Sequence, residues 1–113
     1  MHFGPDVDGE GVQRQTIRAI VIASSVFVNL GFDCWVTSLV RKDDVNSLHA
    51  YGMAADFDSS REVGDTRFRL IRDMIALRLG DNYDVVYHKG HIHVEYDVTG
   101  HDIELYRDGN RIR

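Results

Sequence analysis

The segment His91–Tyr96, with the sequence HIHVEY, alternates strictly between ionisable and apolar residues. Successive side chains of a β-strand point to opposite faces. His91, His93 and Glu95 are therefore expected on one face, and the three apolar residues on the other. This pattern predicts a strand in a sheet that has one face on a hydrophobic core. The ionisable face is either plain solvent-exposed surface or part of a site.

The size and composition of the chain favour one ordinary globular domain spanning residues 1–113. Of its 113 residues, 43% are hydrophobic and 27% charged, which suits a single modest core. The formal net charge is −5, without a run of lysine or arginine. Nucleic acid is therefore excluded as the main partner, because phosphate binding needs clustered positive charge.

The single cysteine, Cys34, excludes an intramolecular disulfide. It precedes Trp35 and Val36 in an apolar stretch, and we interpret it as a small buried residue of a strand. A nucleophilic cysteine needs a base and a lowered pKa, and no neighbour in the sequence suggests either.

Residues 1–11 contain the only proline and several acidic residues, and they are interpreted as a loop or N-terminal arm. A secretory signal would carry basic residues there, so none is expected. The most apolar run, residues 17–32, contains Arg18, Ser24, Ser25 and Asn29 and falls short of a membrane span. We expect a monomer that does not insert into membranes and is synthesised in a cytoplasm.

Two helices are predicted, over residues 12–30 and 65–79. Gly31 and Gly80 are placed to end them, and Asp65 to cap the second. The first has a stripe at three- and four-residue spacing, expected to face the core: Ile17, Ile20, Val21, Ser24, Phe27, Val28 and Phe32. The corresponding stripe of the second is Phe68, Ile71, Ile75 and Leu79.

Stretches rich in β-branched and aromatic residues predict the strands. They cover residues 34–40, 53–57, 84–87, 92–96 and, as an edge strand, 103–106. The resulting order is helix, strand, strand, helix, strand, strand, strand. This order predicts a single α+β domain, with a mainly antiparallel sheet and helices on one face.

A second segment, residues 47–57, ends in the strand predicted at 53–57 and contains His49 and Asp56. On a helix these residues would lie about 10 Å apart along the axis, too far to share a zinc ion with bonds of about 2 Å. A loop that turns at Gly52 and continues into a strand brings them together. The alternative is a polar loop histidine and an aspartate that caps a strand. Two imidazoles and a carboxylate would give a zinc ion three ligands and leave one position for water.

Two patterns carry a resemblance to a known family: Ser47-x-His49-x-x-Gly52-x-Ala54-x-Asp56 and His91-x-His93. They resemble the zinc peptidases that cleave D-alanyl-D-alanine and L-alanyl-D-glutamate bonds in bacterial cell walls. That family includes D-Ala-D-Ala carboxypeptidases, dipeptidases of vancomycin resistance and many phage endolysins, and Hedgehog proteins share its fold. The resemblance covers about residues 37–96. Its first pattern fixes five residue types over ten positions.

The resemblance implies that His49, Asp56 and His93 bind Zn²⁺. It also implies that Arg41, which ends the run Thr37-Ser-Leu-Val-Arg41, reaches the site, although Leu and Val replace the usual Gly-Tyr. Its guanidinium would bind a substrate carboxylate or stabilise an oxyanion. The alternative is a solvated loop arginine.

The general base departs from the family pattern. Many members place an acidic residue three positions before the last histidine ligand, where this chain has Gly90. Another branch has His-x-His, so the resemblance assigns the acid–base role to His91. Glu95 is either the fallback base or an acceptor that orients a ligand imidazole. Ser47 is expected to support His49 by a hydrogen bond, because the Gly-x-Ser-x-Gly elbow of a nucleophilic serine is absent.

The expected function is a zinc peptidase that hydrolyses the stem peptides of peptidoglycan. We expect a phage endolysin that is made in the host cytoplasm and acts on the wall after release. The alternative is a zinc-stabilised binding or structural module of the same fold, without hydrolysis.

Overall fold

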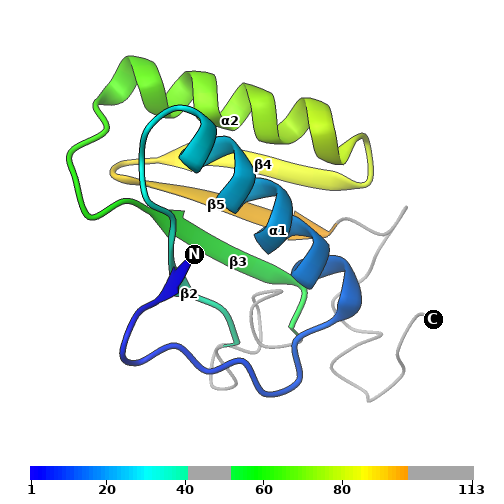
Figure 1. The fold of residues 1–113 in the computed structure, drawn as a ribbon. Coiled ribbons are helices and arrows are strands. Elements are labelled where there is room, and N and C mark those ends of the chain that lie inside the picture. The colour runs from blue at the N-terminus through cyan, green and yellow to red at the C-terminus, as the bar shows by residue number, and fades with distance from the viewer. Residues whose placement is uncertain (41–51, 97–113) are drawn as a thin grey trace.

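A five-stranded sheet and two helices on one of its faces make up the computed structural model, which describes residues 1–40 and 52–96 (Figure 1). The strands are β1 (His2–Phe3), β2 (Trp35–Ser38), β3 (Ala54–Asp58), β4 (Tyr83–His88) and β5 (His91–Tyr96). The helices are α1 (Arg14–Asn29) and α2 (Asp65–Leu79). The predicted α+β class with a mainly antiparallel sheet is confirmed for these residues.

The strands follow the spatial order β1-β2-β3-β5-β4. The pairs β2–β3, β3–β5 and β4–β5 are antiparallel, whereas β1 runs parallel to β2. Strand β1 corrects the prediction that residues 1–11 are only an arm. A strand of two residues is too short to show an alternating pattern in the sequence. It is held to β2 by a hydrogen bond from His2 N–H to the carbonyl of Cys34 at 2.9 Å. The predicted edge strand at 103–106 lies outside the described residues.

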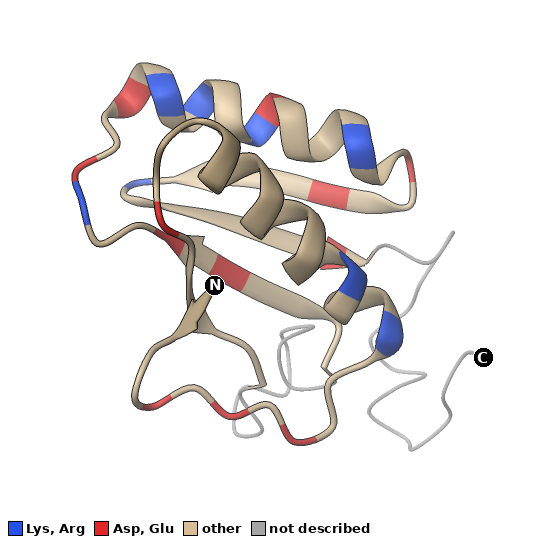
Figure 2. Ribbon diagram, in the orientation of Figure 1, with Lys and Arg blue, Asp and Glu red and all other residues tan. Residues whose placement is uncertain are grey.

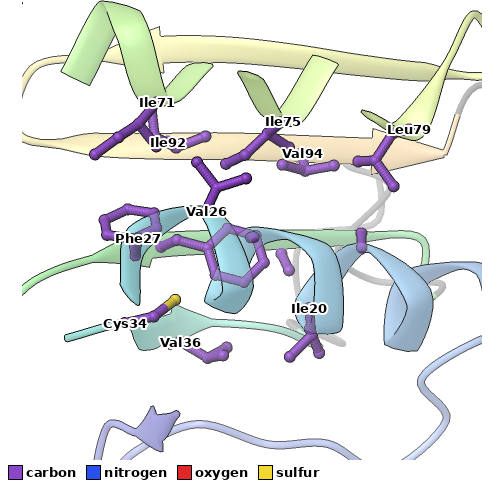
Figure 3. Close-up of a cluster of buried hydrophobic side chains, with 14 of the residues drawn as sticks. Ile20, Val26, Phe27, Cys34, Val36, Ile71, Ile75, Leu79, Ile92 and Val94 are labelled. Atoms are coloured by element: carbon purple, nitrogen blue, oxygen red, sulfur yellow. The ribbon is translucent and has the colours of Figure 1, made fainter. Parts of the chain in front are cut away.

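The hydrophobic core lies between the sheet and the two helices (Figure 3). Ile92 and Val94 are 0% and 1% exposed, so the alternation of β5 was predicted correctly. Cys34, just before β2, is also fully buried. Burial raises the pKa of its thiol to about 12, as expected for an inert apolar residue rather than a nucleophile.

The two helices differ in how well their buried faces were predicted. All four residues of the predicted α2 stripe are buried. On α1 the predicted face was wrong at Ile17, Val21 and Val28, which are 49%, 56% and 56% exposed. Ala19 and Ala23 are buried instead, because small side chains let α1 approach the sheet closely. Charged residues mark the outer side of α2, whereas α1 carries them only near its N-terminus (Figure 2).

The helix termini also refine the predictions. Gly64, with φ of 83°, is the N-cap of α2, so the assignment of Asp65 as N-cap was wrong. Asp65 lies in the first turn and pairs with Arg69 at 3.1 Å, where a carboxylate interacts favourably with the helix dipole. Gly31, with φ of 87°, follows the end of α1 as predicted. No helix in the described part of the chain has the length and apolar character needed to cross a membrane.

Candidate functional site

The face of the sheet opposite the helices carries a cluster of ionisable side chains on β3 and β5. Asp56 and His93 are direct cross-strand partners, and Glu95 follows two residues later on the same face as His93. Asp56 is only 8% exposed. A carboxylate at that depth is stable only when it is hydrogen-bonded or paired with a charge.

His93 supplies that pairing through one ring nitrogen and contacts Glu95 through the other. Its Nδ1 lies 2.7 Å from Asp56 Oδ1, and its Nε2 lies 3.1 Å from Glu95 Oε1. Burial lowers the pKa of the imidazole, but hydrogen bonds to the two carboxylates and their charges outweigh it and raise the pKa to about 9. In the metal-free protein at neutral pH, His93 is therefore a cation that donates to both carboxylates.

The donor chemistry of this cluster fits part of a zinc site. Two ligands of one zinc ion, each about 2 Å from it, lie roughly 3 Å apart; Asp56 Oδ1 and His93 Nδ1 are 2.7 Å apart and hydrogen-bonded to each other, so both are close enough to share an ion that would replace the proton between them. Within residues 1–40 and 52–96, no group of three His, Cys, Asp or Glu residues is placed to hold a metal. Glu95 does not complete a set because it contacts the opposite nitrogen of His93.

The predicted ligand His49, and with it Arg41 and Ser47, lies outside the described residues. Gly52 is described, and its φ of 71° confirms the expected tight turn. A Cβ there would lie 2.1 Å from the carbonyl oxygen of Gly11. The Gly52 carbonyl accepts hydrogen bonds from Gln13 N–H at 3.0 Å and Thr16 Oγ1 at 2.7 Å. The entry into β3, two residues before Ala54, is thus fixed against the start of α1.

His91 lies on the same face of β5 as His93, at the end next to the β4–β5 turn. It is the cross-strand partner of His88, and the two ring centroids are 5.6 Å apart. The His88 ring is also 6.5 Å from that of His93. Gly90 lies in the turn with φ of 79°, a conformation that favours glycine over an acidic residue.

A hydrogen-bonded cluster around Asp33 was not predicted. Its carboxylate accepts from Trp35 Nε1 at 2.8 Å, Ser59 Oγ at 2.5 Å, Ser60 Oγ at 2.5 Å and Ser60 N–H at 3.0 Å. The hydrogen bonds from Ser59, Ser60 and Trp35 hold the pKa of Asp33 well below its usual range. The cluster ties the loop after β3 to the start of β2. No local pattern marks it, because the serines are 26 and 27 positions away.

A cavity of about 400 Å³ adjoins this loop at the end of β3. Its lining includes Asp58 from the end of β3, Arg61 from the loop, Asp65 and Phe68 from α2, and Gly90 from the turn before His91. Burial raises the pKa of Asp58. The cavity therefore lies at the end of the sheet, where Asp58 of β3 meets residues of α2.

A comparison with models of known protein families and with curated protein sequences finds no match. The family resemblance therefore depends on the motif residues.

Proposed function

We propose that this protein is a zinc peptidase that hydrolyses the stem peptides of bacterial peptidoglycan. The observation that carries the proposal is the contact of Asp56 with His93 across β3 and β5. Two residues that the motif assigns as ligands, 37 positions apart, place a carboxylate oxygen and an imidazole nitrogen 2.7 Å apart. His49 is the third ligand of the proposal.

Glu95 supports the same assignment. Histidines that bind a metal usually donate their other ring N–H to a carboxylate, which fixes the ring and its tautomer. Glu95 Oε1 lies 3.1 Å from His93 Nε2, so His93 Nδ1, beside Asp56, is the nitrogen assigned to the metal. Glu95 is therefore proposed as the residue that orients the His93 ring, in preference to a role as base.

The chemistry of the proposed reaction divides between the metal and the chain. A bound zinc ion would supply Lewis acidity towards water and the peptide carbonyl. The oxygen of water bonds to the carbonyl carbon, the C–N bond breaks, and the leaving amine takes up a proton. His91 is assigned the proton transfer at a ring nitrogen. The Arg41 guanidinium is assigned the substrate carboxylate or the developing oxyanion.

Digestion of purified peptidoglycan with the zinc-loaded protein, followed by mass analysis of the fragments, tests the proposal. New L-Ala, D-Glu or D-Ala termini are expected, and chelator-treated protein should release none. His49→Ala should lose both zinc content and cleavage. The matched variant His88→Ala, which removes another histidine, should keep its zinc. Full activity of a metal-free His49→Ala protein would overturn the zinc mechanism.

A second candidate is a zinc-stabilised binding module without hydrolysis. The observation that favours it is Gly90, whose positive φ disfavours an acidic residue at the position where many family members have their base. Intact sacculi at every zinc concentration, together with retained zinc binding, would support the module. An endolysin would instead degrade the wall once released from the cytoplasm in which it is made.

A further inference from the structure

The ionisable face of the sheet continues past Asp56 to an aromatic pair on the first two strands. Trp35 of β2 and His2 of β1 are cross-strand neighbours. Their rings are stacked, with centroids 4.7 Å apart and an interplanar angle of 23°. On its other side Trp35 pairs with Asp58 of β3. Because Asp58 and Asp56 are two residues apart on one strand, all these side chains lie on the same face.

The indole ring is held in a fixed orientation. Trp35 Nε1 donates to Asp33 Oδ2 at 2.8 Å, and Asp33 is itself held by Ser59 and Ser60. Trp35 is partly exposed. The other large apolar side chains of the sheet mostly lie on its opposite face, in the core. A rigid, partly exposed aromatic ring beside a carboxylate is a binding surface of low conformational entropy cost.

We propose that Trp35, with one face of its ring covered by His2, forms a stacking platform for the N-acetylmuramic acid ring to which the stem peptide is attached. A pyranose ring has an apolar C–H face that packs on an aromatic ring, and hydroxyl groups that donate to a carboxylate such as Asp58. The platform accordingly offers both kinds of contact side by side. This inference rests on the proposed function for the identity of the substrate.

The position of the platform also selects the bond. Neighbouring strands are about 4.8 Å apart and alternate residues about 6.6 Å apart, so Trp35 lies roughly 8 Å from Asp56 in the plane of the sheet. An extended peptide covers that distance in two to three residues, at about 3.3 Å each. The sugar is that close to the L-alanyl-D-glutamate bond and too far from the D-alanyl-D-alanine bond. The platform therefore assigns the L-alanyl-D-glutamate bond as the one cleaved.

Trp35 is the only tryptophan of the chain, so its fluorescence reports binding directly. The probe is N-acetylmuramyl-L-alanine, which lacks the scissile bond, added to the zinc-loaded full chain. A saturable fluorescence change is expected, with binding about tenfold tighter than that of N-acetyl-L-alanine. Equal binding of the two probes, or no response to the sugar-containing one, would overturn the platform.

Variants separate the platform from a general structural role. His2→Ala removes the stacking partner at an exposed end of the sheet and should weaken binding of the muramyl probe about threefold. The matched variant Phe3→Ala removes the next aromatic residue of β1, on the opposite face, and should leave binding unchanged. An equal loss of affinity for the muramyl probe in both variants would count against the platform.

Kinetics distinguish failure of the platform from failure of the peptidase. Trp35→Ala should raise KM for a muramyl-linked stem peptide about tenfold with kcat unchanged, and leave the sugar-free peptide unaffected. If that variant does not fold, His2→Ala provides the same test. Saturable binding without cleavage would retain the platform and reject the peptidase. Cleavage that is insensitive to both substitutions would retain the peptidase and reject the platform.

Discussion

The two faces of the sheet are built from alternate residues of the same strands, yet they differ in almost every physical property. On β3, Phe57 is 0% exposed beneath the helices, whereas its neighbours Asp56 and Asp58 lie on the opposite face. On β5, Ile92 is buried in the core and His93 pairs with two carboxylates. The core face excludes water with apolar contacts, and the other face keeps charged groups close together.

The difference teaches where the stability of the fold comes from. Burial of one large apolar side chain contributes about 1.5–3 kcal/mol. A buried ion pair contributes less than its attraction alone, because desolvation of both groups opposes that attraction. For His93 the carboxylates outweigh the desolvation of the ring and raise its pKa, so the pair with Asp56 adds to the stability of the outer face. The apolar core remains the larger source, because it contains many buried side chains.

The largest expected effect comes from substituting neighbouring residues of β3 that lie on opposite faces of the sheet. Phe57→Ala should lower the free energy of unfolding by about 4 kcal/mol, through lost burial and the cavity left behind. Asp58→Ala, on the opposite face of the same strand, should cost about 1 kcal/mol or less. Urea denaturation followed by circular dichroism measures both. Similar losses would mean that the outer face contributes as much to stability as the core.

A second effect concerns the turn that leads into β3. Gly52→Ala should destabilise the protein by about 3 kcal/mol, because it combines a positive φ with a contact against the Gly11 backbone. Gly31→Ala is the matched control. Its φ is also positive, but nothing lies within 4 Å of an added Cβ, so the expected cost is about 1 kcal/mol. Equal losses of unfolding free energy in urea denaturation would show that a small backbone shift relieves the close contact at Gly52.

The contrast between the faces also explains what the sequence could predict. The buried face of β5 was predictable because ionisable and apolar residues alternate strictly along it. That of α2 was predictable because Phe68, Ile71, Ile75 and Leu79 recur at three- and four-residue spacing, although Leu70 and Leu77 are exposed. The face of α1 was predicted wrongly in part, because its apolar residues surround most of the helix and spacing alone does not select a side. The motif predicted that Asp56 and His93 lie close together. It could not predict their hydrogen bond, because that depends on the register between β3 and β5.

Other features had no signal in the sequence. Strand β1 is two residues long, and its pairing depends on backbone hydrogen bonds that any residue except proline can make. The cluster at Asp33 joins two loops, and each of its serines resembles an ordinary turn residue. Side chains that gain their role from a distant contact cannot be recognised from local patterns.

The third prediction tests whether Glu95, on the outer face, orients the His93 ring. Glu95→Gln should weaken zinc binding about tenfold, because an amide oxygen accepts the His93 Nε2 hydrogen less strongly than a carboxylate does. Asp84→Asn, which removes the same charge from the cross-strand neighbour of Glu95 on β4, should change the zinc affinity much less. Competition with a chromogenic chelator measures both. Equal affinities for Glu95→Gln and the unmodified protein would contradict the orienting role.

The smallest expected effect tests whether the link that holds Trp35 is electrostatic. The pKa of Asp33 is lowered in the folded protein, and an unfolded aspartate has a pKa of about 3.9. The carboxylate therefore contributes stability that is complete above about pH 5. This contribution is lost as pH falls from about 4 towards the lowered pKa of the folded state, because the unfolded chain then binds more protons.

Asp33→Asn should accordingly be less stable than the unmodified protein at neutral pH, and the gap between their urea midpoints should narrow from pH 5 to pH 3. Ser60→Ala removes the hydroxyl donor and leaves the backbone donor of the same residue, so it should show a smaller gap that narrows in the same direction. A gap that stays constant over this range would mean that Asp33 acts by shape and neutral hydrogen bonding. In that case a neutral residue could hold the indole ring equally well, and the muramyl probe should bind Asp33→Asn with unchanged affinity.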